Sequence, residues 1–314
     1  MKKNFYLFIT ILILIPTFVV SIIFKSLKNE QTDNNTPIVT TTDKITTVIQ
    51  ETKKDIKVSI NKDGEVKELN LEEYIIGVVA GEMPASFHEE ALKSQAVASR
   101  TYAMYKIENS KNLETTTDDQ VYITIDEMNN KWGSDFDKYY KKITKAVKDT
   151  EGLVMKQNNK LFKSFYFAMS NGYTEDSLTV FGESNLESVS SPWDNETLNK
   201  FIVDTTFTKE SLENLLNIKD IKTLEIVSRD KTNRVSKIKV NNKEFTGIEF
   251  RKLLTLRSTD FTITKDNDNY IITTKGYGHG VGMSQYGANG MAKENHPYEE
   301  ILKYYYKDIE ITKI

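Results

Sequence analysis

"LEEYIIGVVAGEMPASFHEEALKSQAVASRTYAMYKIE", residues 71–108, contains two adjacent helix patterns. The first predicts a short helix over residues 71–83 that stops before Pro84, because proline disfavours a continuing helix. The second predicts a longer helix in which Ser86 is the N-cap and Glu89 occupies the capping-box position. Glu82 then lies at a helix end, in a mostly apolar neighbourhood.

A carboxyl group in that position loses solvation. This loss raises its pKa towards the value that a general acid needs near neutral pH. Glu82 is therefore a candidate catalytic acid. The spacing alone fits equally a glutamate that only caps or solvates the junction between two helices.

The flanking segments predict the fold class. Alternating residues on either side of Lys62-Asp63-Gly64 predict a β-hairpin before the helices. A further helix is expected over residues 135–150, ending at Gly152. Short apolar runs separated by Asn, Gly and Asp then dominate, interrupted by helices near 208–217 and 246–254. The pattern predicts an α+β fold with helices early and a β-rich later part.

The N-terminus carries a long apolar run, "FYLFITILILIPTFVVSIIF", over residues 5–24. Twenty uncharged residues with lysines on both sides predict a transmembrane anchor. A cleaved signal peptide is the alternative, but it would have a shorter apolar region followed by small residues. The expected organisation is a cytoplasmic tail (1–4), an anchor (5–24), a Thr/Asn-rich stalk (25–55) and an extracytoplasmic domain (56–314).

Composition excludes several classes of function. The chain of 314 residues has a net charge of −3 and scattered Lys and Arg, which argues against a nucleic-acid partner. It has no cysteine, which excludes disulfides, thiolate metal sites and a cysteine nucleophile. His88, His279 and His296 form no metal-binding pair, so no metal and no cofactor is expected. A serine hydrolase built on His279 and Ser284 lacks the strand-to-helix nucleophile elbow.

Two further segments are candidates for binding. "GYGHGVGMSQYG", residues 276–287, has five glycines, which allow positive φ and close approach of the backbone to a ligand. His279, Ser284, Gln285 and Tyr286 would then project from one tight ridge. The Ser170-Asn171-Gly172 turn presents hydroxyl and amide groups, either to a sugar or within an ordinary hairpin.

Several of these stretches together resemble the SpoIID/LytB family of cell-wall proteins. The resemblance is carried by "EYIIGVVAGEMPASFHEEALKSQAVASRTYA", "DDQVY", "AMSNGYTEDSLTVFGESNLESVSSPWD", "EFRKLLTLRST" and "GYGHGVGMSQYGANGMA", and it runs from about Leu71 to the terminal "YEEILKYYYKDIEI". It implies a membrane-anchored lytic transglycosylase that cuts septal peptidoglycan, on strands freed of stem peptides, during engulfment in sporulation. It also implies partnership with the amidase SpoIIP and the membrane protein SpoIIM. A non-catalytic, glycan-binding enhancer of an amidase is the alternative within the same family.

The resemblance places the catalytic glutamate on Glu82 and a substrate groove around it. One wall of the groove is expected to contain Ser170, Asn171, Tyr277, His279, Ser284, Gln285 and Tyr286, with His279 orienting the substrate or bracing the loop. Tyr277 stands where relatives often carry tryptophan, and it keeps an aromatic face for a sugar ring. Asp118 and Asp119 stand without the Cys and His that serve some relatives as metal ligands, so no zinc is expected.

Four basic or polar residues complete the candidate set. Gln95 and Arg100 lie five residues apart, about 140° apart around a helix, so we expect one to meet substrate and the other to brace the fold. Arg251 and Arg257 flank a Leu-rich helix end and are expected to form structural ion pairs.

Overall fold

The computed structural model describes residues 55–183 and 185–314, and residues 55–314 form one compact unit. The predicted tail, anchor and nearly all of the stalk lie outside these residues. Within the described ranges no helix combines the length and the apolarity that crossing a membrane requires.

The predicted hairpin is confirmed. Strands β1 (Lys57–Lys62) and β2 (Glu65–Asn70) pair antiparallel, with Lys62 opposite Glu65. Asp63 and Gly64 both adopt positive φ, as the tight turn of a two-residue hairpin requires. A short third strand, β3 (Leu113–Glu114), pairs parallel to β1 and completes the sheet.

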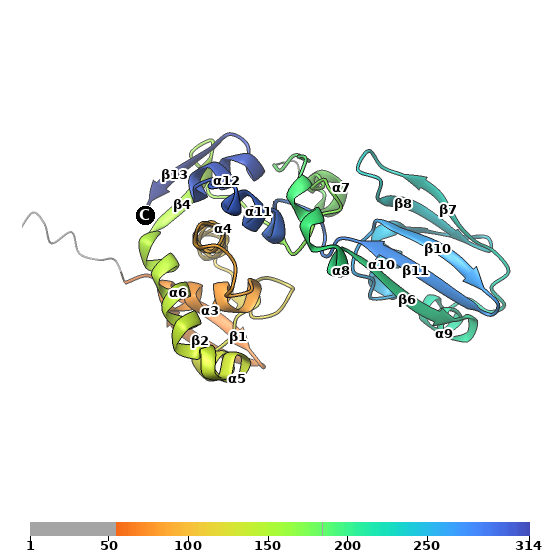
Figure 1. Cartoon of the computed structure of the whole chain (residues 1–314), viewed down its shortest axis with the longest axis horizontal. Coiled ribbons are helices and arrows are strands. Elements are labelled where there is room, and N and C mark those ends of the chain that lie inside the picture. Colours follow the sequence, from red (N-terminus) through yellow and green to blue (C-terminus); the bar gives the residue numbers. More distant parts are fainter. Residues whose placement is uncertain (1–54, 184) are drawn as a thin grey trace, which may run out of the picture. The chain divides into compact units, whose positions relative to one another are not determined.

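Helix α4 (Glu89–Glu108) lies at the centre of the first hydrophobic core. Figure 1 shows it nearly end-on, with helices from both ends of the chain around it. These helices are α3 (Leu71–Glu82), α6 (Phe136–Asp149), α11 (Gln285–Lys293) and α12 (Tyr298–Tyr305), while α5 (Ile125–Trp132) and the 3-10 turn η1 (Gly133–Asp135) pack beside α6.

The predicted N-cap of this central helix is wrong. The helix starts at Glu89, and His88 is its N-cap, with Nδ1 accepting a hydrogen bond from the Glu90 backbone. The chain between Pro84 and Phe87 instead forms a turn closed by a backbone hydrogen bond of 2.9 Å between those two residues. The Ser-x-x-Glu pattern therefore lies two residues too early for the cap.

Two small sheets join distant segments in the first core. Strands β4 (Leu153–Gln157) and β13 (Ile309–Lys313) pair antiparallel, and β5 (Tyr166–Phe167) and β12 (Met283–Ser284) pair parallel. Between β5 and the second core lie α7 (Ser177–Phe181), the 3-10 helix η2 (Pro192–Thr197) and α8 (Leu198–Phe201).

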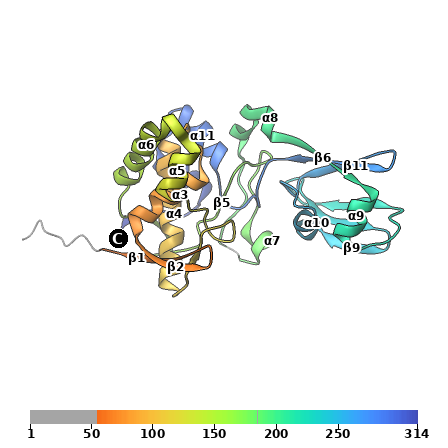
Figure 2. The same cartoon turned by 90° about the horizontal axis from the view of Figure 1, so that it is seen from below.

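Residues 202–275 build a second hydrophobic core around Phe250 and Phe261. Its two three-stranded antiparallel sheets have the orders β10-β11-β6 and β7-β8-β9. The predicted helices are confirmed as α9 (Lys209–Leu216) and α10 (Gly247–Leu253), which pack against the strands (Figure 2). The strands are β6 (Ile202–Thr208), β7 (Leu224–Arg229), β8 (Val235–Val240), β9 (Lys243–Thr246), β10 (Phe261–Asp266) and β11 (Asn269–Lys275).

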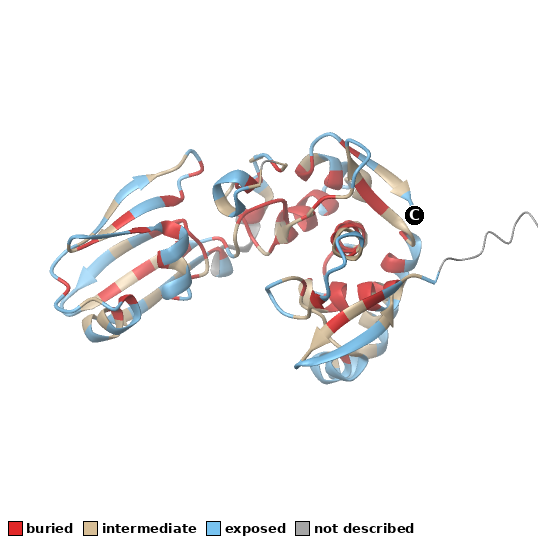
Figure 3. Ribbon diagram, turned by 180° about the vertical axis from the view of Figure 1, so that it is seen from behind, coloured by how far each residue is buried: buried red, intermediate tan, exposed pale blue. Residues whose placement is uncertain are grey.

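Burial follows the expected strand periodicity in this second core. Alternate residues of β11 are buried, including Tyr270, Ile272 and Thr274, and Figure 3 shows the alternation along its ribbon. The mixed α+β class is therefore confirmed, with helices dominating up to residue 149 and most strands following.

Candidate active site

Glu82 is the last residue of α3, and donors from three distant segments meet at its carboxyl group. The helix ends there because Met83 is extended and Pro84 follows. Oε1 accepts a hydrogen bond of 2.7 Å from the Val121 backbone N–H, and Oε2 accepts one of 3.3 Å from the Gln285 side-chain amide. The Tyr166 hydroxyl also donates to this carboxyl group.

The backbone explains how these donors come together. Tyr166 pairs with Met283 in the β5–β12 ladder, and Gln285 follows that ladder at the start of α11. The loop with Val121 approaches α3 closely because α3 has a glycine at position 81. A Cβ atom on Gly81 would lie 2.3 Å from the Val121 carbonyl oxygen, a distance that no side chain tolerates.

Buried polar side chains fix the orientation of these donors. Gln95 accepts a hydrogen bond of 3.4 Å from Gln285 and donates one of 2.9 Å to Ser99. Gln120 donates a hydrogen bond of 2.9 Å to the Tyr166 hydroxyl and accepts one of 3.1 Å from another buried hydroxyl, that of Tyr74. Such a satisfied network holds the groups around Glu82 in one geometry.

Burial raises the pKa of Glu82, while the hydrogen bonds from Val121, Gln285 and Tyr166 partly oppose this rise. Glu82 therefore keeps its proton to a higher pH than an ordinary glutamate does. Burial and the Glu82 charge raise the pKa of Tyr166 well above its usual value, so its hydroxyl stays a neutral donor. The Glu82 residue is only partly buried, which leaves part of it accessible from solvent.

A second carboxyl group, that of Asp119, lies near Tyr74 together with Glu82. It is used within the fold, because Lys106 binds it at 2.7 Å, the Tyr102 hydroxyl at 2.7 Å and the Glu114 backbone N–H at 2.9 Å. Asp119 is thus held in a structural ion pair, and Glu82 is the carboxyl group with a raised pKa at this site.

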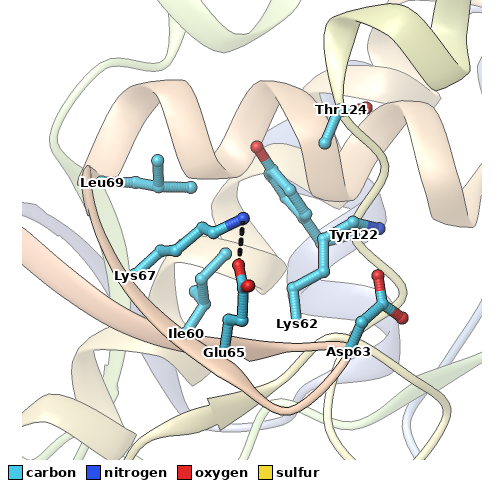
Figure 4. A pocket seen from close by; sticks show the side chains of 8 residues that line it. All are labelled: Ile60, Lys62, Asp63, Glu65, Lys67, Leu69, Tyr122 and Thr124. Atoms are coloured by element: carbon cyan, nitrogen blue, oxygen red, sulfur yellow. Dashed lines mark ion pairs between the residues drawn. The ribbon is translucent and has the colours of Figure 1, made fainter.

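A hollow of about 420 Å³ lies beside the same loop, between the β1–β2 hairpin and Tyr122 (Figure 4). Three of its four charged side chains are paired: Lys67 binds Glu65 at 3.0 Å and Lys62 binds Glu127 at 2.9 Å. The fourth, Asp63, lies in the turn of the hairpin, so both lysines of the hollow are already neutralised within the fold.

His279 lies in the glycine-rich segment, on the other face of β5 from Glu82. Its ring packs against Phe165 and Phe167, with centroid distances of 5.9 and 5.8 Å, whereas Tyr166 between them faces Glu82. Nδ1 accepts a hydrogen bond of 3.0 Å from the Val281 backbone, and the ring also bonds to the Tyr166 backbone. Burial, and then the charge of Arg251, lower the pKa of His279 to about 3, so the ring is neutral and braces the loop.

The glycines of this segment allow its backbone to pack closely against the chain around β5. Gly278 and Gly282 have φ values of +117° and +78°, and a Cβ on Gly282 would lie 1.9 Å from the Phe165 carbonyl oxygen. The positive φ and close approach predicted from composition are therefore present, and the close approach is to β5.

Ser170 and Ser284 are fully buried and both donate to one buried carboxyl group. Each hydroxyl lies 2.6 Å from an oxygen of Asp194, and Ser191 makes a third bond of the same length. Burial raises the pKa of Asp194, and the serine hydrogen bonds oppose the rise. The cluster ties together the loop after β5, the start of α11 and η2, so both predicted serines have structural contacts.

The remaining wall residues differ in exposure. The Asn171 amide donates to the Thr232 carbonyl and to Asp260, both at 2.8 Å, and so links the turn to the second core. Tyr277 is 48% exposed, and the Arg257 guanidinium lies 4.2 Å from its ring centroid. Tyr286 packs edge-on against Phe87 at 4.9 Å.

Gln95 and Arg100 have different surroundings in the structure. Gln95 belongs to the network beside Glu82, although it is completely buried and acts through Gln285. Arg100 is also completely buried, and it binds both oxygens of Glu72 at 2.8 and 2.6 Å and the Leu153 carbonyl at 3.1 Å. Arg100 therefore braces α4 against α3 and β4.

The ion pairs predicted for Arg251 and Arg257 are wrong for the described part of the chain. Arg257 stacks on Tyr277 and donates to the Lys200 carbonyl at 3.2 Å. The Arg251 side chain makes neither a hydrogen bond nor an ion pair with any residue that the structure describes, and its buried Nε has no partner.

Sequence reasoning missed Tyr166, Gln120 and the Val121 backbone as neighbours of Glu82, and Asp194 as the centre of the serine cluster. All four lie in the quoted family stretches or directly before them, but spacing alone gave no sign that they meet. Across residues 55–183 and 185–314 no three His, Asp or Glu side chains are grouped so that they would hold a metal ion.

Comparison with known proteins identifies the family to which the chain belongs. A family profile described as "Stage II sporulation protein" matches residues 60–156, and one described as a domain of unknown function (DUF8618) matches residues 126–282. The chain belongs to the SpoIID family, as the resemblance indicated.

Individual relatives agree with this assignment. The chain is 38% identical over 261 residues to stage II sporulation protein D of Bacillus subtilis (strain 168), covering 79% of this chain and 76% of that protein. The same protein of Bacillus amyloliquefaciens matches equally. The "Amidase enhancer" of Bacillus subtilis is 30% identical over 294 residues, covering 75% of this chain and 40% of that protein.

Proposed function

We propose that this chain is a lytic transglycosylase that cuts the glycan strands of peptidoglycan, with Glu82 as its acid and then its base. The observation that carries the proposal is a single, partly buried carboxyl group with a raised pKa, surrounded by fixed donors. Hydrolysing glycosidases ordinarily use two carboxyl groups. An enzyme that lets the sugar's own hydroxyl attack needs one.

The reaction balances with this one group. Protonated Glu82 donates to the glycosidic oxygen, the bond from that oxygen to the anomeric carbon breaks, and an oxocarbenium-like state forms. The C6 hydroxyl of the same sugar then bonds to the anomeric carbon and gives its proton to the Glu82 carboxylate. The products are a free hydroxyl on the leaving strand and a 1,6-anhydromuramic end, with no water consumed.

The surrounding donors have defined roles in this scheme. The Val121 N–H and the Gln285 amide hold the carboxyl group in place in both protonation states. The Tyr166 hydroxyl stabilises the carboxylate once the proton has left. These groups thus limit the rise in pKa that burial alone would cause.

The biological setting follows from the relatives. We place this activity in sporulation, as the name of the 38% identical relatives suggests. Septal peptidoglycan whose stem peptides an amidase has removed is the substrate that the family resemblance implies. SpoIIP as the amidase, SpoIIM as a membrane partner and a single-pass anchor at residues 5–24 belong to the same proposal. The catalytic domain would then face the space outside the cytoplasm.

The test is product analysis with a glutamine variant. The full chain, purified in mild detergent, is incubated with stem-peptide-free glycan strands, and the ends are identified by mass spectrometry. Wild type should give anhydro ends, and Glu82→Gln should lower the rate by about 10²–10⁴-fold. Glu73→Gln, at an exposed position of the same helix, should stay active. Equal rates for wild type and Glu82→Gln would rule out Glu82 as the acid.

The non-catalytic alternative rests on the 30% identity to the "Amidase enhancer". It predicts no anhydro product from wild type, together with stimulation of an added amidase that Glu82→Gln leaves unchanged. The same preparations distinguish the two functions.

A further inference from the structure

A second cavity, of about 150 Å³, lies between α7, β8 and α10. His279 lines it, so the cavity is on the opposite face of β5 from the Glu82 carboxyl group. It is therefore separate from the proposed cleavage site, and only the glycan source of the ligand named below rests on the proposed function.

The Arg251 side chain, from α10, decides which kind of ligand this cavity can bind. The side chain is largely enclosed, its Nε is buried without a partner, and it forms no ion pair with residues 55–183 or 185–314. Burial lowers the pKa of this guanidinium, which shows that its charge is poorly solvated. Buried charges in proteins are normally paired, because leaving one unpaired is costly. The Arg251 guanidinium thus has no anionic partner among the described residues.

The other charged groups around the cavity already have partners. Arg234 donates to Thr232 at 2.8 Å and to the Tyr173 carbonyl at 2.9 Å, and lies 3.7 Å from Glu175. Glu175 accepts from Thr232 at 2.8 Å, and burial raises its pKa to about 7. Asp230 lies 2.6 Å from the same Thr232 hydroxyl, whose single proton the two carboxyl groups share, and accepts from the Arg234 backbone at 3.1 Å. Both carboxyl groups are therefore occupied locally, and Arg251 remains available to a ligand.

The shape and lining of the cavity restrict the ligand. A volume of 150 Å³ holds about five water-sized groups. Val180, Val235 and Ile248 supply apolar walls, and the neutral His279 ring adds another. The nearby acids Glu175 and Asp230 disfavour a doubly charged anion such as phosphate. A guanidinium group binds a carboxylate in a bidentate manner, through two parallel hydrogen bonds.

We propose that this cavity binds one small, singly charged carboxylate, which pairs with Arg251. Two sources offer this chemistry: a free hydroxy acid, and the lactyl group that muramic acid exposes once its stem peptide is gone. Both present a carboxylate on two or three carbon atoms, which fits the volume and the apolar walls.

The first arm of the test uses free D-lactate. Thermal unfolding of the full chain in detergent is followed with increasing sodium D-lactate against sodium chloride at equal ionic strength. A ligand that binds only the folded state should raise the unfolding temperature saturably, by a few degrees at high occupancy. Arg251→Gln should abolish the rise. Lys252→Gln, which removes a charge from the exposed side of the same helix, should keep it.

The second arm uses glycan oligosaccharides without stem peptides, compared with the same oligosaccharides after conversion of their lactyl carboxyl groups to amides. Binding is measured by calorimetry with the Glu82→Gln chain, which prevents cleavage. A preference for the carboxylate form that Arg251→Gln removes identifies the glycan as the source, and an effect of lactate alone identifies a free acid.

An NMR measurement on the wild-type chain tests the proposal even if the Arg251→Gln variant does not fold. The ¹⁵N signal of the Arg251 Nε–H should shift on addition of the ligand that binds. If neither D-lactate nor the glycan shifts that signal, or if Arg251→Gln responds as wild type does, the cavity is not a carboxylate site.

Discussion

The neutral, enclosed His279 predicts that acid destabilises this protein in a specific way. Its Nδ1 accepts a hydrogen bond from the Val281 backbone, and a protonated ring cannot accept it. The pKa of His279 falls from 6.5 to about 3 on folding, so between these values the unfolded chain binds a proton that the folded chain does not. Folding stability contributed by the neutral ring is complete above pH 6.5 and is lost as the pH falls.

The magnitude follows from the linkage relation. Each pH unit between the two pKa values costs about 1.36 kcal/mol, so lowering the pH from 6.5 to 5.0 costs up to about 2 kcal/mol through this one group. His279→Gln removes the titration. At pH 7.5 this variant should be less stable by about 1–3 kcal/mol, because the Val281 N–H loses its acceptor. The stability gap to wild type should then shrink by up to about 2 kcal/mol as the pH falls to 5.0.

The assay is denaturant unfolding of wild type and His279→Gln at several pH values from 7.5 to 5.0. His296→Gln is the matched control, since His296 is a partly exposed histidine whose Nδ1 lies 2.9 Å from Glu300. Its gap to wild type should not shrink with acid. A gap for His279→Gln that stays constant or widens towards pH 5.0 would show that the ring is not held neutral in the fold.

Three further outcomes are expected. Gly81→Ala should lower cleavage by roughly tenfold to hundredfold with the circular dichroism spectrum retained, because its Cβ would displace Val121, which donates to Glu82; full activity would contradict the geometry. Arg100→Met should cost about 3–5 kcal/mol in urea unfolding, since it leaves the partly buried Glu72 carboxylate unpaired, and a loss below about 1 kcal/mol would argue against the brace. Asp194→Asn should cost about 2–4 kcal/mol in thermal unfolding, because the carboxylate accepts three serine hydrogen bonds, and an unchanged unfolding temperature would refute this role.

Local sequence patterns predicted the elements well. The Lys62-Asp63-Gly64 turn, the helix that ends before Pro84, and α9 and α10 all follow from residues that lie close together in the chain. The capping pattern places the N-cap of α4 two residues early, because Ser86 with Glu89 matches that pattern and His88 does not, whereas the turn after Pro84 makes His88 the cap. Such boundaries depend on packing that the pattern does not contain.

The candidate site could be predicted only in part. Glu82 and Gln285 were identified, and the structure brings them within 3.3 Å of each other although they are 203 residues apart. Ser170 and Ser284 are expected near substrate, but their hydroxyls donate to Asp194 inside the fold. The identity of a polar residue in a family motif does not reveal whether its side chain faces a ligand or a buried partner.

Short-range propensity and periodicity are enough to predict the α+β class, the helix that ends at Glu82, and the backbone freedom of the glycine-rich segment. The folded chain is needed to see that Tyr166 faces Glu82 while His279 lies on the other side of the same strand, and that the Arg251 side chain has no partner among the described residues. Solvation and hydrogen bonding depend on which distant groups come into contact. The raised pKa of Glu82 and the lowered pKa of His279 therefore arise from the folded structure as a whole.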